Sequence, residues 1–205
     1  MIYDLGDGTV LRRYRNAAQS AERDGSAMRA AAAAGARVPR VHSADGPDLV
    51  MDAVSGPSML ADLLAHPDRA ERYGEVLADL HGRLDRVPLR SASTGLVHGD
   101  LHPGNVLLSP DGPVLIDWTN ATWAERSLDV AATWILLTCF DSDDPAVEPM
   151  ITAVREPLLS AFLRGVDRTA AASSLREAAR IRHDDPATRP EERRRIDQLC
   201  RDHAR

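Results

Sequence analysis

The strongest constraint on the fold is a segment in the middle of the chain, where two short apolar runs flank a turn-forming string. The runs are residues 106–108 (VLL) and 114–116 (VLI), and residues 109–113 (SPDGP) join them. Pro, Asp and Gly in such a string favour a tight turn, so we expect a β-hairpin. Because a hairpin reverses the chain, it brings Asn105 before the first strand close to Asp117 after the second.

The first fifty residues combine short strands with one helix. Residues 2–13 are expected to form two strands around the turn 6–8 (GDG). Residues 17–34 are rich in alanine and stop at a glycine, which is typical of a helix with a glycine after its last turn. A strand at 49–51 then leads into the connector 52–57, which contains Gly and Pro and is expected to separate a small lobe from a larger one.

The remainder of the chain has mainly helical periodicity. Residues 67–87 carry apolar side chains at helical spacing, so we expect an amphipathic helix in which His81 belongs to the core. Residues 130–140 are apolar enough to be a buried helix, and 150–165 form another amphipathic stretch. In residues 189–205 arginines alternate with acidic residues, which favours a solvated helix face over a nucleic-acid or membrane patch.

Composition restricts the class of protein. A chain of 205 residues with 43% hydrophobic content can bury a core, in one domain with two lobes at most. The net charge of −6 argues against nucleic acid as a partner. No apolar run is long enough for a membrane span, and the start of the chain lacks the pattern of a secretory signal, so a cytoplasmic protein is expected. All 25 basic residues are arginine.

Four polar residues around the expected hairpin have the spacing of a reactive site. His98, Asp100 and Asn105 lie in the string LVHGDLHPGN, and Asp117 follows the hairpin. A carboxylate can accept a proton from an acceptor hydroxyl, and amide and carboxylate oxygens suit Mg²⁺. The spacing H-x-D-x-x-x-x-N, followed by a hairpin and a second Asp, is the pattern used in phosphoryl transfer.

The strings HGDLHPGNVLL and VLIDW closely resemble the aminoglycoside phosphotransferase family, whose members share a protein-kinase-like fold. The resemblance covers about residues 5–140. It implies an α+β fold in which residues 1–54 form a small, truncated, β-containing N-terminal lobe with the hinge, and residues 55–205 form a mainly helical C-terminal lobe. It also implies ATP and Mg²⁺ as cofactors.

The resemblance assigns roles to the residues that match the motifs. Asp100 is the expected catalytic base, and Asn105 and Asp117 are the expected Mg²⁺ ligands. His98 is an expected support of the catalytic loop. Asp129, in the later segment Leu-Asp-Val-Ala, is expected to brace the same loop.

On the nucleotide side the resemblance points to Arg12 as the cation that holds the phosphates and to Asp24 as its acidic partner, with Arg13 and Glu22 as rivals. Arginine stands where the family usually has lysine, and aspartate where it has glutamate. The chain begins at about the second strand of the small lobe, so the preceding strand and the phosphate-covering loop are not expected. The hinge that contacts adenine through its backbone is Met51, Asp52, Ala53 and Val54.

These expectations leave more than one function open. The first is transfer of the γ-phosphoryl group of ATP to a hydroxyl of a small molecule, such as an antibiotic or a metabolite. The alternative is a degenerate kinase-like module that binds a nucleotide or ligand without turnover. A metallophosphoesterase based on His102 is disfavoured, because only His183 and His203 follow Asn120 as further histidines.

The identity of the acceptor is also open. The acidic stretch 141–144 (DSDD) together with Glu148 could pair with a cationic acceptor such as an aminosugar. The competing interpretation is an ordinary solvated loop between two helices. We expect no nucleic acid and no membrane as partners.

Overall fold

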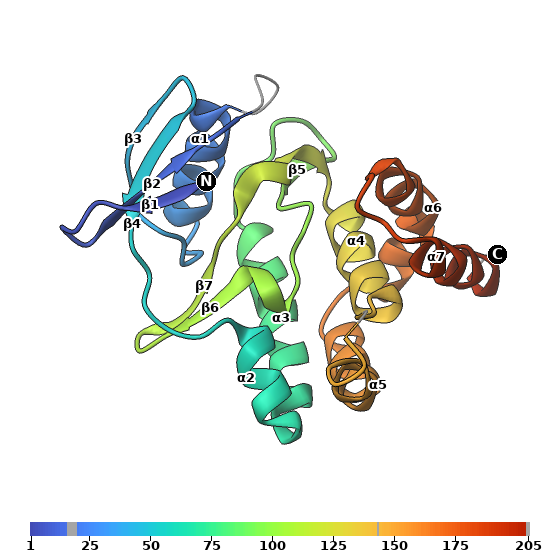
Figure 1. Ribbon diagram of the computed structural model, residues 1–205. Helices are drawn as coiled ribbons and strands as arrows, with labels where there is room; N and C mark the ends of the chain where they lie inside the picture. The colour runs from blue at the N-terminus through green and yellow to red at the C-terminus, as the bar shows by residue number, and fades with distance from the viewer. Residues whose placement is uncertain (16–19, 143, 204–205) are drawn as a thin grey trace.

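The computed structural model describes residues 1–15, 20–142 and 144–203. It contains a sheet with one helix at the N-terminal end of the chain and a larger, mainly helical part that follows it (Figure 1). The strands are β1 (Ile2–Asp4), β2 (Thr9–Arg13), β3 (Val41–Asp45), β4 (Asp48–Asp52), β5 (Thr94–Val97), β6 (Val106–Ser109), β7 (Gly112–Leu115) and β8 (Thr122–Glu125). The helices are α1 (Ala21–Ala33), α2 (Met59–Ala65), α3 (Ala70–Leu84), α4 (Arg126–Cys139), α5 (Glu148–Arg164), α6 (Arg168–Asp184) and α7 (Pro190–Asp202). The expected α+β architecture is therefore confirmed.

The N-terminal sheet has the antiparallel strand order β1-β2-β4-β3, with α1 packed against it (Figure 1). The expected hairpin around residues 6–8 and the strand at 49–51 are both present. Helix α1 begins after Ser20, whose hydroxyl caps the Arg23 amide, and the first residues of the expected helix lie outside the described residues. Gly25 allows α1 to approach the sheet, because a Cβ there would lie 3.0 Å from the Cβ of Ala44.

The connector after β4 is attached to the central hairpin. The amide of Leu108 donates to the carbonyl of Pro57 at 2.9 Å, and Ser58 forms a bridge with Leu107. Gly56 has a φ of +130°, and a Cβ at this position would lie 2.1 Å from the Leu108 carbonyl oxygen. The chain therefore passes along β6 before it enters α2.

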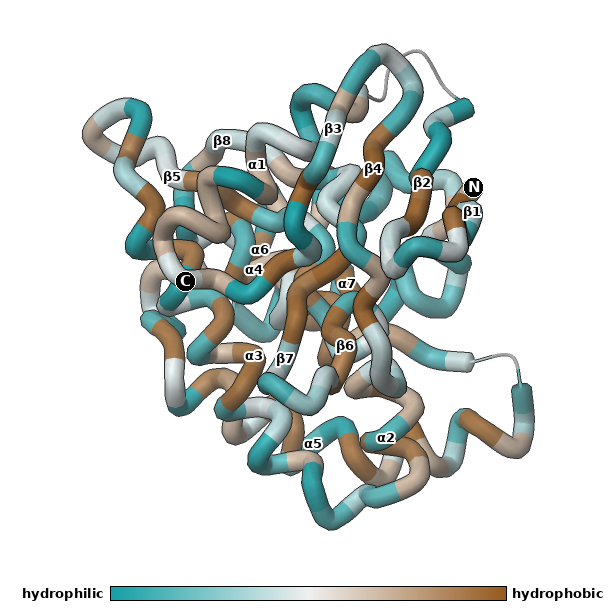
Figure 2. Tube along the Cα trace, turned by 90° about the vertical axis from the view of Figure 1, so that its left-hand side faces the viewer, coloured by the Kyte–Doolittle hydropathy of each residue, from teal (hydrophilic) through white to brown (hydrophobic). Residues whose placement is uncertain are grey.

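The central hairpin is formed as expected, with β6 and β7 paired from Val106 opposite Leu115 to Ser109 opposite Gly112. The turn is tighter than the string 109–113 suggested, since only two residues separate the strands. Figure 2 shows hydrophobic stretches of β6 and β7 in the middle of the molecule. Val106 and Leu115 are fully buried and fix the register, because a shift by one residue would move both to the opposite face.

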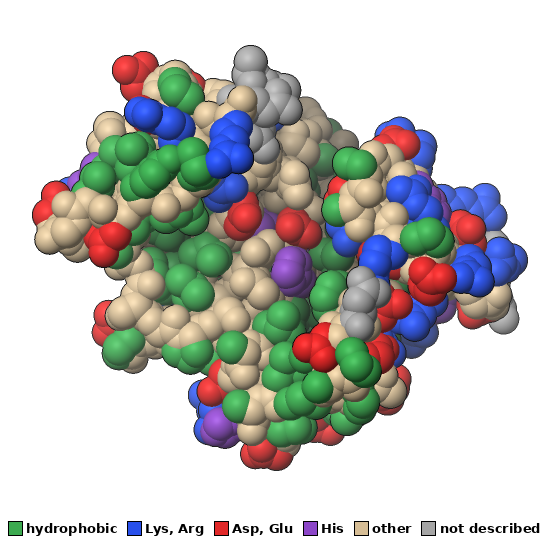
Figure 3. Space-filling view, viewed as in Figure 1, with side chains coloured by type: hydrophobic (Ala, Val, Ile, Leu, Met, Phe, Trp, Pro, Cys, Tyr) green, Lys and Arg blue, Asp and Glu red, His purple; other side chains and the backbone are tan. Residues whose placement is uncertain are grey.

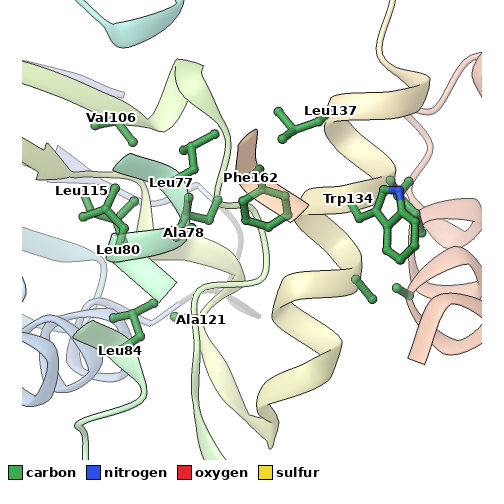
Figure 4. Close-up of a cluster of buried hydrophobic side chains, with 14 of the residues drawn as sticks. Leu77, Ala78, Leu80, Leu84, Val106, Leu115, Ala121, Trp134, Leu137 and Phe162 are labelled. Carbon is green, nitrogen blue, oxygen red and sulfur yellow. The ribbon is translucent and has the colours of Figure 1, made fainter. Parts of the chain in front are cut away.

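Helix α3 forms the expected amphipathic helix and packs against α5 and the hairpin. It begins at Ala70 because residues 67–69 form a 3₁₀ turn that starts with proline. Figure 4 shows its apolar face, with Leu77, Leu80 and Leu84, in the same cluster as Phe162 from α5. His81 is buried in this face, as expected.

The C-terminal helices α6 and α7 pack on α4, which is the buried apolar helix predicted from residues 130–140 (Figure 1). The charged C-terminal segment forms the expected helix, yet one side of it is docked. Ile196 and Leu199 are buried there, and buried Glu192 accepts a hydrogen bond from Arg182 at 2.9 Å. Among the described residues, no helix has both the length and the apolar character required to cross a membrane.

Candidate active site

The loop between β5 and β6 is built around His98. This side chain is completely buried and lies 4.9 Å from the ring of Trp118. Its Nε2 lies 3.0 Å from the carbonyl oxygen of Ile116, and its Nδ1 accepts the amide of Asp100 at 3.3 Å. Nε2 therefore carries the proton. Burial lowers the pKa of His98, despite the nearby carboxylates that act in the opposite direction, so the imidazole is neutral.

Asp129 holds the same loop from the first turn of α4. Its carboxylate accepts the amide of His98 at 2.9 Å and the amide of Gly99 at 2.7 Å, and the residue is only 4% exposed. Gly99 has a φ of +78°, and a Cβ there would lie 2.7 Å from the carbonyl oxygen of Asn120. The loop therefore has little room to adopt another path.

His81 supports this arrangement from α3. Its Nδ1 lies 3.6 Å from a carboxylate oxygen of Asp129, and its Nε2 lies 3.0 Å from the hydroxyl of Thr133. Thr133 in turn donates to the carbonyl of Leu101 at 2.7 Å. Burial lowers the pKa of His81, so this histidine acts as a neutral structural group.

Asp100 and Asn105 are in direct contact. The side-chain amide of Asn105 donates to the Asp100 carbonyl at 2.9 Å and to its Oδ2 at 3.1 Å. The amide of Ile116 donates to the Asn105 carbonyl at 2.9 Å, so the pairing of the hairpin extends to the residue before Asp117. The structure thus brings Asp100, Asn105 and Asp117 into one site.

Asp117 has an unusual backbone conformation. It is the one non-glycine residue in the described part of the chain with positive φ, at 59°. Such a conformation costs about 1–3 kcal/mol and persists only where the surroundings impose it. Its Oδ1 accepts the Thr119 hydroxyl at 2.8 Å and the Arg12 guanidinium at 2.9 Å. Burial acts to raise the pKa of Asp117, but the Arg12 charge and these hydrogen bonds outweigh it and lower the pKa.

The expected ion pair between Arg12 and Asp24 is wrong. Arg12 reaches Asp117 instead, because the ring of Tyr14 lies between the two expected partners. The Arg12 guanidinium is 5.1 Å from the centre of that ring, and the Tyr14 hydroxyl donates to Asp24 Oδ2 at 2.5 Å. Asp24 is fully buried and also contacts Arg23 at 3.3 Å.

The two rivals on the nucleotide side point elsewhere. Arg13 forms a bidentate pair with Asp48 at 2.7 and 2.6 Å. Glu22 accepts the amide of Gly46 at 2.8 Å. Neither Asp48 nor Gly46 belongs to the catalytic loop.

The expected hinge runs from the end of β4 into the connector, and part of its backbone is already paired. The amide of Asp52 donates to the Arg40 carbonyl, and the amide of Ala53 donates to the Gly8 carbonyl, both at 2.9 Å. Met51 is paired within the sheet, opposite Val10 of β2. Val54 follows as the first residue beyond these contacts.

Asp100 lies where two cavities meet. One cavity of about 240 Å³ lies toward α2, α4 and α5, and a second of about 480 Å³ lies toward α6. Figure 3 shows the hollow between the two parts of the molecule, with acidic side chains and a histidine on its floor. Arg182 lines both cavities and His102 lines the first. The sequence pattern did not indicate Arg182, and it singled out His102 only for the disfavoured metallophosphoesterase.

In the acidic stretch considered for a cationic acceptor, the carboxylates of Asp141 and Glu148 already have partners. Asp141 pairs with Arg189 and, at 3.3 Å, with Arg195 of α7. Glu148 accepts the amide of Ser142 at 2.7 Å. Residue 143 lies outside the described residues. The docking of α7 against the end of α4 explains this pairing, which a linear sequence does not show.

Solved structures with the same architecture define the fold. A choline/ethanolamine kinase family protein from Mesorhizobium loti is 16% identical, with a TM-score of 0.58 over 99% of this chain and 83% of that chain. The aminoglycoside phosphotransferase APH(4)-Ia is 14% identical, with a TM-score of 0.57 over 98% of this chain and 88% of that chain. The macrolide 2′-phosphotransferase MphH from Brachybacterium faecium is 15% identical, with a TM-score of 0.51 over 98% and 91%. The fold is therefore protein-kinase-like.

The family follows from the sequence. The pattern that describes the phosphotransferase enzyme family matches residues 2–167, so the chain belongs to this family. Membership supports a phosphotransferase of the kinase type. A curated relative, a probable bifunctional tRNA threonylcarbamoyladenosine biosynthesis protein from Methanosarcina mazei, is 26% identical over 172 residues. The match spans 83% of this chain but only 28% of the relative.

Proposed function

We propose that the chain transfers the γ-phosphoryl group of ATP to a hydroxyl of a small molecule. The observation that carries this proposal is the bond between the Ile116 amide and the Asn105 carbonyl, which sets Asn105 and Asp117 side by side next to Asp100. Residues 1–54 would form the nucleotide side, and residues 55–205 the acceptor side.

The donor set at this site fits Mg²⁺. Asn105 uses its side-chain NH₂ group toward Asp100, so its Oδ1 is the group left for a metal, and Asp117 has a second carboxylate oxygen beyond the one that Arg12 contacts. In the described part of the chain, no three His, Cys, Asp or Glu side chains are grouped to hold a metal. Mg²⁺ commonly needs only one or two protein oxygens, since phosphates and water complete its shell. When bound, the ion would neutralise negative charge on the phosphates.

Asp100 would receive the acceptor proton. As the acceptor oxygen bonds to the γ-phosphorus, the bond from that phosphorus to the β–γ bridging oxygen breaks, ADP leaves, and the hydroxyl proton moves to the carboxylate. The side-chain amide of Asn105 would orient this carboxylate directly, and the imidazole Nδ1 of His98 accepts the backbone amide of Asp100. Positioning of this kind supplies most of the catalysis in phosphoryl transfer.

The decisive experiment measures ADP release from ATP and Mg²⁺ with a panel of hydroxylated compounds. We expect Asp100→Asn and Asp117→Ala to lower turnover by about a hundredfold or more, in the range that general bases contribute. Asp111→Asn is the matched control, because Asp111 is an exposed residue of the same hairpin. Wild-type rates in either of the first two variants would refute the proposed roles.

A second candidate is a module that binds nucleotide without turnover. Two contacts favour it, because each uses a group that ATP or Mg²⁺ would need. Arg12 donates to Asp117, and the Ala53 amide donates to the Gly8 carbonyl. The enclosed space between Arg12, Met51 and Ile116 is only about 20 Å³. Binding of ATP measured by calorimetry without ADP release for any compound would support the module over the enzyme.

A further inference from the structure

The smaller cavity beside Asp100, called the apolar cavity below, is lined mainly by aliphatic side chains. Four helices, α2, α4, α5 and α6, and the catalytic loop contribute to its walls. Leu63, Leu137 and Val154 come from α2, α4 and α5 and are buried. The full apolar lining is Leu60, Leu63, Pro103, Leu136, Leu137, Phe140, Ile151, Val154 and Leu158.

The rim of the apolar cavity carries an aromatic side chain that contacts little of the core. Phe140, at the end of α4, is 42% exposed although it lines the cavity. Leu60 of α2 is partly exposed on the same lining. Both side chains would lose water contact if an apolar group entered the cavity, and that transfer is favourable.

The charged groups of the apolar cavity include one carboxylate, that of Asp100. The other ionisable groups in its walls are Arg155, Arg182 and His102. Among the residues that the structure describes, the walls thus contain no second anion to receive an ammonium group.

Both arginines are already held by partners. Arg182 donates to buried Glu192 at 2.9 Å and to Asp185 at 3.1 Å. Arg155 donates to the Phe140 carbonyl at 2.6 Å and lies 3.9 Å from a carboxylate oxygen of Glu148. These contacts leave the walls close to neutral. A cation that entered would lose hydration without a counter-charge other than the catalytic carboxylate.

From these observations we infer that the acceptor is a neutral alcohol with an apolar body, which fills the apolar cavity and presents its hydroxyl to Asp100. The inference rests on the proposed function and specifies its substrate class. A volume of about 240 Å³ suits a compact body, since pockets for drug-sized ligands span roughly 300–1,000 Å³. Polycationic aminosugars are then poor acceptors.

Binding of a cationic acceptor in the second cavity is the competing outcome. Its walls carry Asp184 and Asp185, the carboxylates that a cationic acceptor would use. Asp184 pairs with Arg180 at 3.3 Å and Asp185 with Arg182 at 3.1 Å. Since both are already paired, the apolar cavity is the better acceptor site.

The test compares two isosteric alcohols, 3,3-dimethylbutan-1-ol and choline, which differ by a neutral carbon in place of the quaternary nitrogen. Hygromycin B serves as the polycationic probe. We measure kcat/KM from ADP release with the wild-type protein, and binding by ligand-observed NMR with Asp100→Asn. We expect at least a tenfold preference for the neutral alcohol in both measurements. Equal or better binding of choline or hygromycin B would overturn the inference.

Variants of residues that line the apolar cavity test whether the preference for the neutral alcohol arises there. Leu60→Asp places a carboxylate in the apolar cavity and should reduce the preference for the neutral alcohol at least tenfold. Leu89→Asp is the matched control on an exposed leucine outside both cavities. Phe140→Ser provides a second variant at an exposed position, and thermal unfolding verifies that each variant is folded. If Leu60→Asp and Phe140→Ser both behave like Leu89→Asp, the apolar cavity is not the acceptor site.

The two proposals fail in different ways. Absence of ADP release with a tenfold binding preference for the neutral alcohol would refute the enzyme and support the ligand class. ADP release with a preference for choline that Asp184→Asn abolishes would support the enzyme and refute the apolar acceptor.

Discussion

The catalytic loop and the nucleotide side of the site are held by different kinds of contact. The loop is fixed through its backbone, since buried Asp129 accepts two of its amides. On the nucleotide side, Arg12 reaches the site through one ion pair to Asp117, whose side chain is 43% exposed. A backbone held by a buried carboxylate has one arrangement, whereas a partly exposed ion pair between two side chains can rearrange at lower cost. We therefore expect rigidity on one side of the site and adjustment on the other.

We expect the largest effect on stability from substitution of Asp129, the buried carboxylate that accepts two amides of the loop. Asp129→Ala leaves two buried amides without an acceptor, and each unsatisfied group costs about 1–3 kcal/mol. Urea unfolding should show a loss of about 2–6 kcal/mol in the free energy of unfolding. Asp79→Ala, at an exposed ion pair of α3, is the control and should change it by less than about 1 kcal/mol. Equal losses in the two variants would remove the distinction between the two kinds of contact.

A smaller change to the same loop should affect activity. Gly99→Ala forces a Cβ to within 2.7 Å of the Asn120 carbonyl at a φ of +78°. The resulting shift of Asp100 should lower kcat by about a hundredfold, as small displacements of catalytic groups do. Gly82→Ala in α3 meets nothing within 4 Å and should leave kcat unchanged. Steady-state kinetics of both variants checks this, and an active Gly99→Ala would show that the loop can adjust.

On the nucleotide side, substitution of Arg12 should change the KM for ATP more than kcat. Arg12→Lys keeps the charge but removes the planar fork, so we expect KM for ATP to rise about tenfold with a smaller change in kcat. Arg13→Lys, on the pair with Asp48, should stay within about twofold. If Arg12→Lys lowers the free energy of unfolding but leaves KM unchanged, Arg12 only stabilises Asp117.

The smallest effect is a dependence of stability on pH. Burial lowers the pKa of His81 and of His98 in the folded state, from an unfolded value of about 6.5. Below that value the unfolded chain binds more protons, so stability should fall as the pH drops from 7.5 to 5.5. Urea midpoints at the two pH values measure this fall. His81→Asn should reduce the pH-dependent part, and an unchanged difference would assign it to other groups.

Sequence patterns predicted those parts of the fold that depend on local signals. The central hairpin and α3 followed from turn residues and helical spacing, and α5 was found within two residues of its start. Helix α2 was missed because it has only seven residues. The pairing of β5 with β8 was missed because each strand has four residues and the partners are far apart in the chain.

The residues of the candidate site also divide into those that a local pattern predicted and those that depend on tertiary packing. Asp100, Asn105 and Asp117 were found together because one hairpin determines their proximity. The Arg12–Asp117 pair was not predicted, since it depends on how the N-terminal sheet packs on the rest of the molecule. Arg182 was missed because α6 brings it to Asp100 from a distant part of the chain, and no local pattern marks it.

The most direct test of the account is a crystal structure with Mg²⁺ and the ATP analogue AMP-PNP. We expect Asn105 Oδ1 and a carboxylate oxygen of Asp117 to lie at about 2.0–2.1 Å from Mg²⁺. We also expect Arg12 to leave Asp117 for the phosphates while the bonds from Asp129 to the loop remain unchanged. A nucleotide bound elsewhere, with the Arg12–Asp117 pair intact, would contradict it.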